Sequence, residues 1–225
     1  LKQSVIVENK EGANGNLGAD LVAKAEPDGY GIVARRVSPY SHMHVWDGSG
    51  TGQIHFSAAS VHAEVLGHIV ENRVVQDALL ECLQGSSIEM LANARMEQMR
   101  RSGDDWLLTL ADGRTLRAPL VIAADGANSA VRRLTGVATR EWDYMHHAIV
   151  TSVRSSKPHQ TTAWQRFTDN GPLAFLPLER DGQQDCCSIV WSTTPSEAEQ
   201  LMALDDEGFC RALERAFEGR LGTVL

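Results

Sequence analysis

The sequence predicts a mixed α/β protein, with helices and strands in the first part and a mostly antiparallel layer of strands in the second. Three observations carry this prediction. A glycine-rich loop follows an apolar run near the start. Apolar residues recur at helical spacing over residues 69–83. Residues 143–194 hold four short strand-like runs, and a helical tail follows them.

Composition and charge narrow the class of protein. The chain has 225 residues, 43% of them hydrophobic, so it can bury a substantial core. Its formal net charge of -8 argues against a general nucleic-acid binder. No apolar run reaches membrane-spanning length, and no signal peptide is visible. The four cysteines form neither a CxxC pair nor a disulfide pattern, which favours a reducing cytoplasm.

The first half contains a strand, a glycine loop and a helix, then a hairpin and a second helix. Residues 5–7 are predicted as the strand and residues 17–25 as the helix. The runs MHVW and QIHF flank a turn over residues 47–52, which is typical of a β-hairpin. Apolar residues over 69–83 form one stripe at helical spacing, so a helix is expected there.

Beyond residue 87 the period changes to two. Residues 106–110 and 116–125 flank a turn with the sequence Ala-Asp-Gly-Arg, a hairpin signal. The second arm ends in LVIAA, residues 120–124, in which every residue is apolar. Such a run is typical of a strand buried on both faces of a sheet. It leads directly into Asp125 and Gly126, and residues 130–134 can begin a helix.

Four strands are expected between residues 143 and 194: HHAIVTSVR, TAWQRFT, LAFLPLE and CCSIVWST. Pro177 in the third strand predicts an edge or a bulge, because proline cannot donate to the sheet ladder. The tail is predicted to be helical over residues 196–204 and 206–217, with Pro195 at the first helix start.

The turn at Asp125 has two interpretations. A carboxylate at the carboxyl end of a buried strand lies where open α/β sheets bind ligands. Gly126 lets a ligand approach the backbone, Ser129 could cap the next helix, and Arg132 and Arg133 could pair with phosphate. In the alternative, this is a plain strand-to-helix turn that Asp125 caps. Local spacing leaves both open.

LVIAADGANSAVRR resembles the second flavin-contact motif of the aromatic-ring flavoprotein monooxygenases. Further blocks, in the same order, resemble the ubiquinone-biosynthesis hydroxylases of that family: ARRVSPYSHMHVWD, LGHIVENRVVQDAL, WDYMHHAIV, LAFLPLE and CSIVWS. The likeness runs over about residues 34–225. It implies an incomplete FAD-binding three-layer domain, about residues 34–139, and a partial substrate domain with a mostly antiparallel sheet, residues 140–225.

The resemblance implies an FAD-dependent monooxygenase whose cofactor carries the chemistry. FAD, reduced by NAD(P)H or another donor, would activate O₂ to hydroxylate a polyprenylated phenol or quinol. Asp125, Gly126 and Asn72 would contact the flavin's ribityl and diphosphate groups. Arg132 is a weaker candidate for the nicotinamide donor or a structural pair. No catalytic side chain and no metal ligand are assigned. The implied location is the cytoplasm, with peripheral membrane or biosynthetic-complex association open.

The family's opening strand with its GxGxxG loop is absent, as is its closing Gly-Asp block, so truncation at both ends and weak or no FAD binding are expected. The glycines at 12, 15 and 18 read GxxGxxG and begin four residues after the apolar run. Residues 5–30 resemble instead the periplasmic substrate receptors of tripartite tricarboxylate transporters. Residues 1–33 are therefore expected to be a foreign or fused segment.

Two other functions stay open at this point: a non-enzymatic module that binds a carboxylate with the N-terminal loop, and an inactive remnant. The histidines raise a separate question. His42 and His44 are expected on one face of the hairpin, with His55 on its other strand. No Cys or carboxylate joins them at ligand spacing, so packed or surface histidines are expected. One of His146 and His147 could face a substrate pocket, because neighbours in a strand point to opposite faces.

Overall fold

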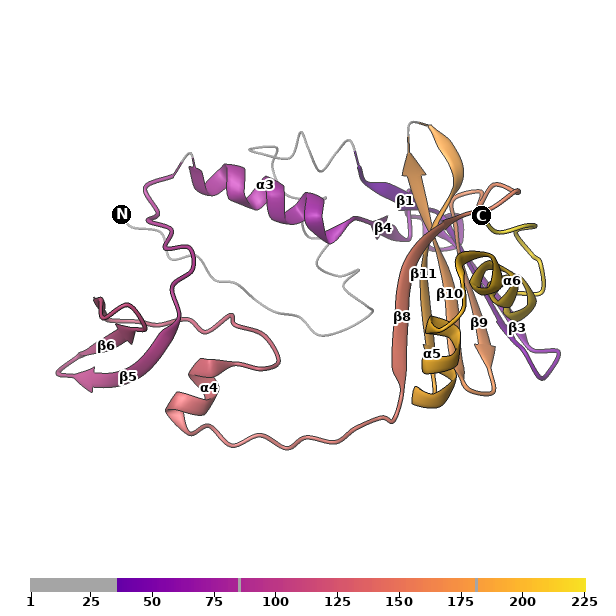
Figure 1. The fold of residues 1–225 in the computed structure, drawn as a ribbon. Coiled ribbons are helices and arrows are strands. Elements are labelled where there is room, and N and C mark those ends of the chain that lie inside the picture. The colour runs from indigo at the N-terminus through magenta and orange to yellow at the C-terminus, as the bar shows by residue number, and fades with distance from the viewer. Residues whose placement is uncertain (1–35, 85, 181) are drawn as a thin grey trace. The chain divides into compact units, whose positions relative to one another are not determined.

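The computed structural model describes residues 36–84, 86–180 and 182–225, and these fall into two compact units. One unit is Ser86–Trp142. The other combines residues 36–84 with Asp143–Leu225. We describe each unit by itself. Residues 42–57 and residues 147–193 share one sheet in the second unit, so this sheet is built from two segments that lie far apart in the sequence (Figure 1).

The second unit is organised around a six-stranded sheet in the order β3-β2-β9-β10-β11-β8. The strands are β2 (His42–Asp47), β3 (Gln53–Ser57), β8 (His147–Arg154), β9 (Thr162–Thr168), β10 (Gly171–Arg180) and β11 (Gln183–Thr193). The β2–β9 pair is parallel and the other pairs are antiparallel. The expected hairpin over residues 43–56 and the four expected later strands are therefore confirmed, and they form one sheet.

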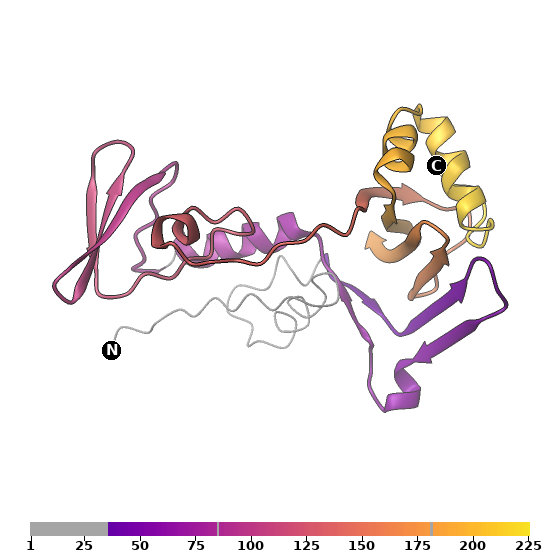
Figure 2. The same cartoon turned by 90° about the horizontal axis from the view of Figure 1, so that it is seen from below.

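Two helices cover one face of this sheet, α5 (Pro195–Met202) and α6 (Asp206–Ala216) (Figures 1 and 2). Each begins at a polar cap: Thr194 accepts from the Glu197 amide, and Asp205 accepts from the Gly208 amide. Phe175 of β10 stacks on Phe217, which follows α6, with ring centroids 3.8 Å apart. Both rings are fully buried, so they anchor the main hydrophobic core on this helix-covered face.

The opposite face, which we call the open face, carries a row of paired residues across all six strands. The row contains Ile54, Val45, Gln165, Ala174, Val190 and Val150, each directly beside the next. Paired residues point to the same side of a sheet. One end of this face is covered by the two-stranded β1 (Ser38–Tyr40) and β4 (Gly67–Ile69), where Tyr40 and Ile69 pack on Ala163 and Leu178.

Pro177 lies in the part of β10 that pairs with β11 but no longer pairs with β9. The pairing of β10 with β9 ends at Phe175, whereas its pairing with β11 continues through Pro177 to a register shift between Leu178 and Arg180. The missing proline N–H therefore breaks no bond to β9. The prediction of an edge or bulge near Pro177 is confirmed.

After β3 the chain forms a short 3₁₀ helix, η2 (Ala58–Val61), and then β4 and α3 (Asn72–Gln84). The helix expected over 69–83 is confirmed, although Ile69 belongs to β4 and the helix begins at Asn72. The apolar stripe of α3 is only partly buried: Ala78 is buried, but Leu79 is 58% exposed.

The unit Ser86–Trp142 holds a three-stranded sheet, in order β5 (Met96–Ser102), β6 (Asp105–Leu110) and β7 (Thr115–Ala118), and the short helix α4 (Ala130–Thr135). The expected hairpin is confirmed as β6–β7. The strand expected at residues 120–124 is wrong: this run is irregular, and Leu120 and Ile122 are 66% and 51% exposed. Pro119 ends β7, and among the described residues no strand pairs with residues 120–124.

The two compact units divide the chain differently from the expected ranges 34–139 and 140–225. The β2–β3 hairpin joins the sheet of the later strands because β2 pairs with β9. The assignment of residues 34–139 to flavin binding concerns function and stays a prediction. The expected foreign segment, residues 1–33, lies outside the described residues.

Candidate functional site

Asp125 caps the helix that follows it. One carboxylate oxygen accepts a hydrogen bond from the Ser129 hydroxyl at 2.6 Å, and the other accepts from the amides of Ala130 and Val131 at 2.7 and 3.1 Å. Ser129 in turn accepts from the Arg132 amide. The Ser129 hydroxyl, followed by the Val131 amide, holds the pKa of Asp125 below its ordinary value. Asp125 is therefore an exposed carboxylate with a fixed orientation that helps to cap α4, and its assignment to a ligand stays a prediction.

Gly126 and Arg132 complete the local geometry of this turn. Gly126 has φ +77°, a left-handed conformation that favours glycine, and a Cβ built there would meet no atom within 4 Å. The Arg132 guanidinium donates to the Ala127 carbonyl at 2.5 Å and lies 3.8 Å from the Glu141 carboxylate. Arg132 thus serves as a local structural pair, one of the two roles expected for it, while the backbone at Gly126 stays open to a ligand.

Asn72 is the first residue of α3 and is exposed. It belongs to the second compact unit, whereas Asp125, Gly126 and Arg132 belong to Ser86–Trp142. The structure therefore brings the latter three residues together in one turn and presents Asn72 separately. Beside Asn72, Glu71 pairs with Arg36 and so ties the start of α3 to the strand region before it.

The open face of the six-stranded sheet is an apolar surface. Ile54 and Phe56 of β3, Phe167 of β9 and Val150 of β8 are between 44% and 66% exposed. The pairings place Ile54 and Val150 in the row described above, while Phe56 lies beside Met43 on the same face. The sequence predicted a partial substrate domain over residues 140–225, without the strands β2 and β3 that join its sheet. The alternation in QIHF could have indicated that β3 contributes, because it puts Ile54 and Phe56 on one face.

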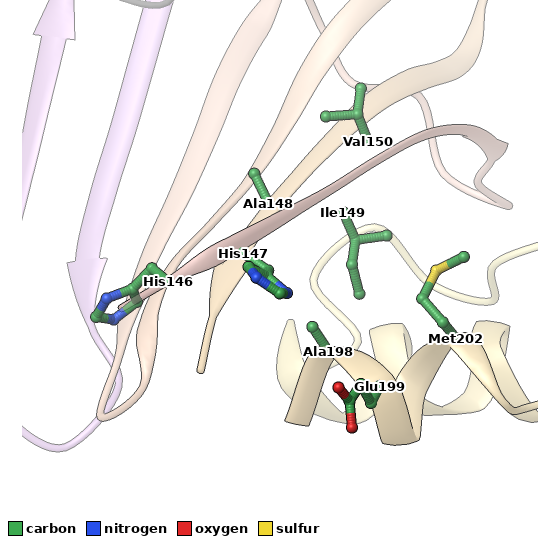
Figure 3. Close-up of a pocket in the computed structure, with 8 residues that line it drawn as sticks. All are labelled: His146, His147, Ala148, Ile149, Val150, Ala198, Glu199 and Met202. Atoms are coloured by element: carbon green, nitrogen blue, oxygen red, sulfur yellow. The ribbon is translucent and has the colours of Figure 1, made fainter. Parts of the chain in front are cut away.

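His146 and His147 both line a pocket of 580 Å³ between β8 and α5 (Figure 3). The other lining residues are Ala148, Ile149, Val150, Ala198, Glu199 and Met202. The pocket wraps around the free edge of β8, which explains why two neighbouring histidines reach it together. The His146 ring is held by the Tyr144 carbonyl, which lies 2.8 Å from Nδ1.

None of the helices in the described part of the chain has the length and the apolar composition of a membrane span.

The sequence profile described as an FAD binding domain matches residues 53–224. This chain belongs to the FAD-binding domain family. The match includes residues of both compact units: it contains the Asp125 turn and five of the six strands of the large sheet, all except β2.

Relatives of this FAD-binding-domain chain include enzymes of ubiquinone biosynthesis. The ubiquinone biosynthesis monooxygenase COQ6 of Xenopus tropicalis is 36% identical over an alignment of 197 residues, and the alignment covers 83% of this chain and 41% of that protein. The 3-demethoxyubiquinol 3-hydroxylase of Escherichia coli is 33% identical over 194 residues, 86% of this chain and 48% of that protein. The chain thus spans less than half the length of either relative.

Solved structures agree with the fold. PqsL of Pseudomonas aeruginosa, a probable FAD-dependent monooxygenase, has a TM-score of 0.68 and 25% identity, covering 83% of this chain and 50% of that one. HpxO of Klebsiella pneumoniae, solved with FAD and uric acid, has a TM-score of 0.60 at 17% identity, covering 84% and 48%, which supports the fold alone. These matches confirm the mixed α/β class. They give the receptor resemblance of residues 5–30 no support.

Proposed function

We propose that this chain is part of an FAD-dependent monooxygenase that hydroxylates the ring of a polyprenylated phenol or quinol in ubiquinone biosynthesis. The observation that carries the proposal is the alignment of more than four-fifths of the chain with the COQ6 monooxygenase. One named relative is a ubiquinone biosynthesis monooxygenase and the other a 3-demethoxyubiquinol 3-hydroxylase, and the matched profile is that of an FAD binding domain. Reduced by NAD(P)H or another donor, the bound FAD supplies the redox chemistry that activates O₂.

The turn at Asp125 supports the flavin side of this proposal. The carboxylate is exposed, is already oriented by three donors, and keeps acceptor capacity for one more. A ribityl hydroxyl is a suitable donor for it. The absence of any atom near the Gly126 Cβ position leaves room for a chain of that size. Asn72 would add an amide contact, and Arg132 would keep the turn rigid through the Ala127 carbonyl.

The open face of the sheet supports the substrate side. A phenol or quinol ring with a polyprenyl tail is largely apolar, and this face presents Ile54, Phe56 and Phe167 to it. Covering an apolar substrate with this surface would exclude water from the reacting ring. Because the tail of such a substrate is insoluble in water, we infer that the enzyme works against a membrane surface or within a group of biosynthetic enzymes.

Titration of FAD into the purified chain, followed by quenching of flavin fluorescence, tests the flavin side. We expect saturable but weak binding of one FAD per chain. Asp125→Asn is expected to weaken it about tenfold or more, since a hydrogen bond to a charged group contributes roughly 1.5–3 kcal/mol. Asn72→Ala is expected to weaken it less, because the lost group is uncharged.

Two controls separate ligand binding from capping. Ser129→Ala removes the hydroxyl bond to Asp125 but leaves the carboxylate, and Arg73→Ala changes the exposed neighbour of Asn72. Both should bind FAD within about threefold of the parent, a change of well under 1 kcal/mol. If no saturable binding occurs, or if Ser129→Ala costs as much as Asp125→Asn, the assignment of this turn to the flavin is wrong.

A further inference from the structure

Two histidines face each other at the β2–β3 end of the helix-covered face. His44 and His55 are direct cross-strand partners in the hairpin, and their Nδ1 atoms lie 3.3 Å apart. The His44 ring stacks on Trp164 of β9, with centroids 5.2 Å apart, and meets Trp46 edge-on. These aromatic contacts fix the His44 ring, and its Nδ1 faces the Nδ1 of His55.

The 3.3 Å separation is that of a hydrogen bond between the two rings, and it is also the separation of two nitrogen ligands on one metal ion. Zinc–nitrogen bonds are about 2.0–2.1 Å long, so two nitrogens on a tetrahedral ion lie about 3.3–3.4 Å apart. Imidazole is also a preferred ligand of zinc, copper and nickel. We propose that His44 and His55 form a two-histidine site for a divalent transition-metal ion, with Zn²⁺ the ion whose geometry fits.

The surroundings define what kind of site this is. Among the described residues, no group of three or more His, Cys, Asp and Glu side chains is placed to hold a metal ion. Water must therefore complete the coordination, and the ion keeps exchangeable positions. The Arg220 guanidinium lies close enough to His44 for their charges to interact. The positive charge of Arg220 repels a metal ion bound at the two histidines, so we expect the affinity of the site for the ion to be modest.

Calorimetric titration of Zn²⁺ into the whole chain tests the site, because all eight histidines lie among the described residues. We expect one Zn²⁺ per chain. His55→Gln changes an exposed side chain, so it should leave the fold intact and weaken binding at least tenfold. His44→Gln should do the same. The matched control is the double variant His146→Gln with His147→Gln, which also removes two histidines and should bind Zn²⁺ like the parent.

A second probe locates the ion without relying on affinity. Cu²⁺ bound at the pair should quench the fluorescence of Trp164 and Trp46, whose rings both contact His44, and Trp164→Phe should remove the share of the quenching that comes from Trp164. Circular dichroism of each variant checks folding. The proposal is overturned if the parent binds no Zn²⁺, if His55→Gln binds it with unchanged affinity, or if the His146/His147 control loses it.

Discussion

His159 shows how a single polar side chain can be built into the core. It is 1% exposed, its Nδ1 accepts from the Thr161 amide at 3.1 Å, and its Nε2 lies 3.4 Å from the Leu178 carbonyl. Since Nδ1 accepts, Nε2 must carry the proton, which fixes one neutral tautomer. The ring thereby connects the segment before β9 to the end of β10.

Stability should therefore depend on the protonation of His159. Burial lowers the pKa of His159 from 6.5, so below about pH 6.5 the unfolded chain binds a proton that the folded chain resists. The free energy of unfolding should accordingly be greatest above that pH and fall as the pH drops through it. Urea denaturation of the parent and of His159→Gln at pH 7.5 and 5.5 measures this contribution.

At pH 7.5 the His159→Gln variant should be less stable than the parent by about 1–3 kcal/mol, because it loses buried hydrogen bonds. It should also lose less stability than the parent between the two pH values. A variant with the same pH dependence as the parent would show that other groups determine it.

At the scale of elements, the six-stranded sheet is stabilised mainly on the side that α5 and α6 cover. Phe217 is 2% exposed, stacks on Phe175 and meets Trp46 edge-on at 5.0 Å. Trp46 also donates from Nε1 to Glu218 at 3.2 Å. The segment after α6 thus holds strands from both ends of the chain on one surface.

Truncating Phe217 tests this packing. Phe217→Ala should reduce the free energy of unfolding by about 3–5 kcal/mol, the usual cost of removing a buried aromatic side chain. Phe167→Ala is the matched control, because Phe167 lies on the sheet and is 49% exposed, so it should cost under about 1 kcal/mol. Thermal and urea unfolding measure both, and equal losses would contradict the assignment of the core to the helix-covered face.

At the scale of the molecule, sequence order and compact units do not coincide. Residues 42–57 share a sheet with residues 147–193, and residues 86–142 form a unit between them in sequence. In the latter unit Leu110 and Ser129 are the buried residues among those described. Regions with few buried contacts open at low free energy, whereas a shared core opens cooperatively.

Hydrogen exchange followed by mass spectrometry should therefore divide the chain into two classes. Amides of β2 are expected to exchange slowly and together with those of β9 and β10. Amides of β5, β6 and β7 are expected to exchange faster. The division would be refuted if the amides of β2 exchanged at the same rate as those of β5–β7 and independently of those of β9.

The sequence by itself determined the local elements of this protein. Alternation in HMHVWD and QIHFS, turn residues at 47–52, and the Thr194 and Asp205 caps depend on neighbours within a few residues, so the hairpin and tail helices were predictable. The motif around Asp125 likewise indicated the family, and the profile match confirmed it.

Only the tertiary structure decided which strands pair and which faces are covered. The parallel pairing of β2 with β9 joins residues 120 positions apart, and no local pattern encodes such a contact. The run at 120–124 reads as a buried strand because each residue is apolar, yet a strand is buried only when other elements cover it. The 3.3 Å approach of His44 to His55 has the same origin, since it depends on the cross-strand register and on the Trp164 ring that a distant strand supplies.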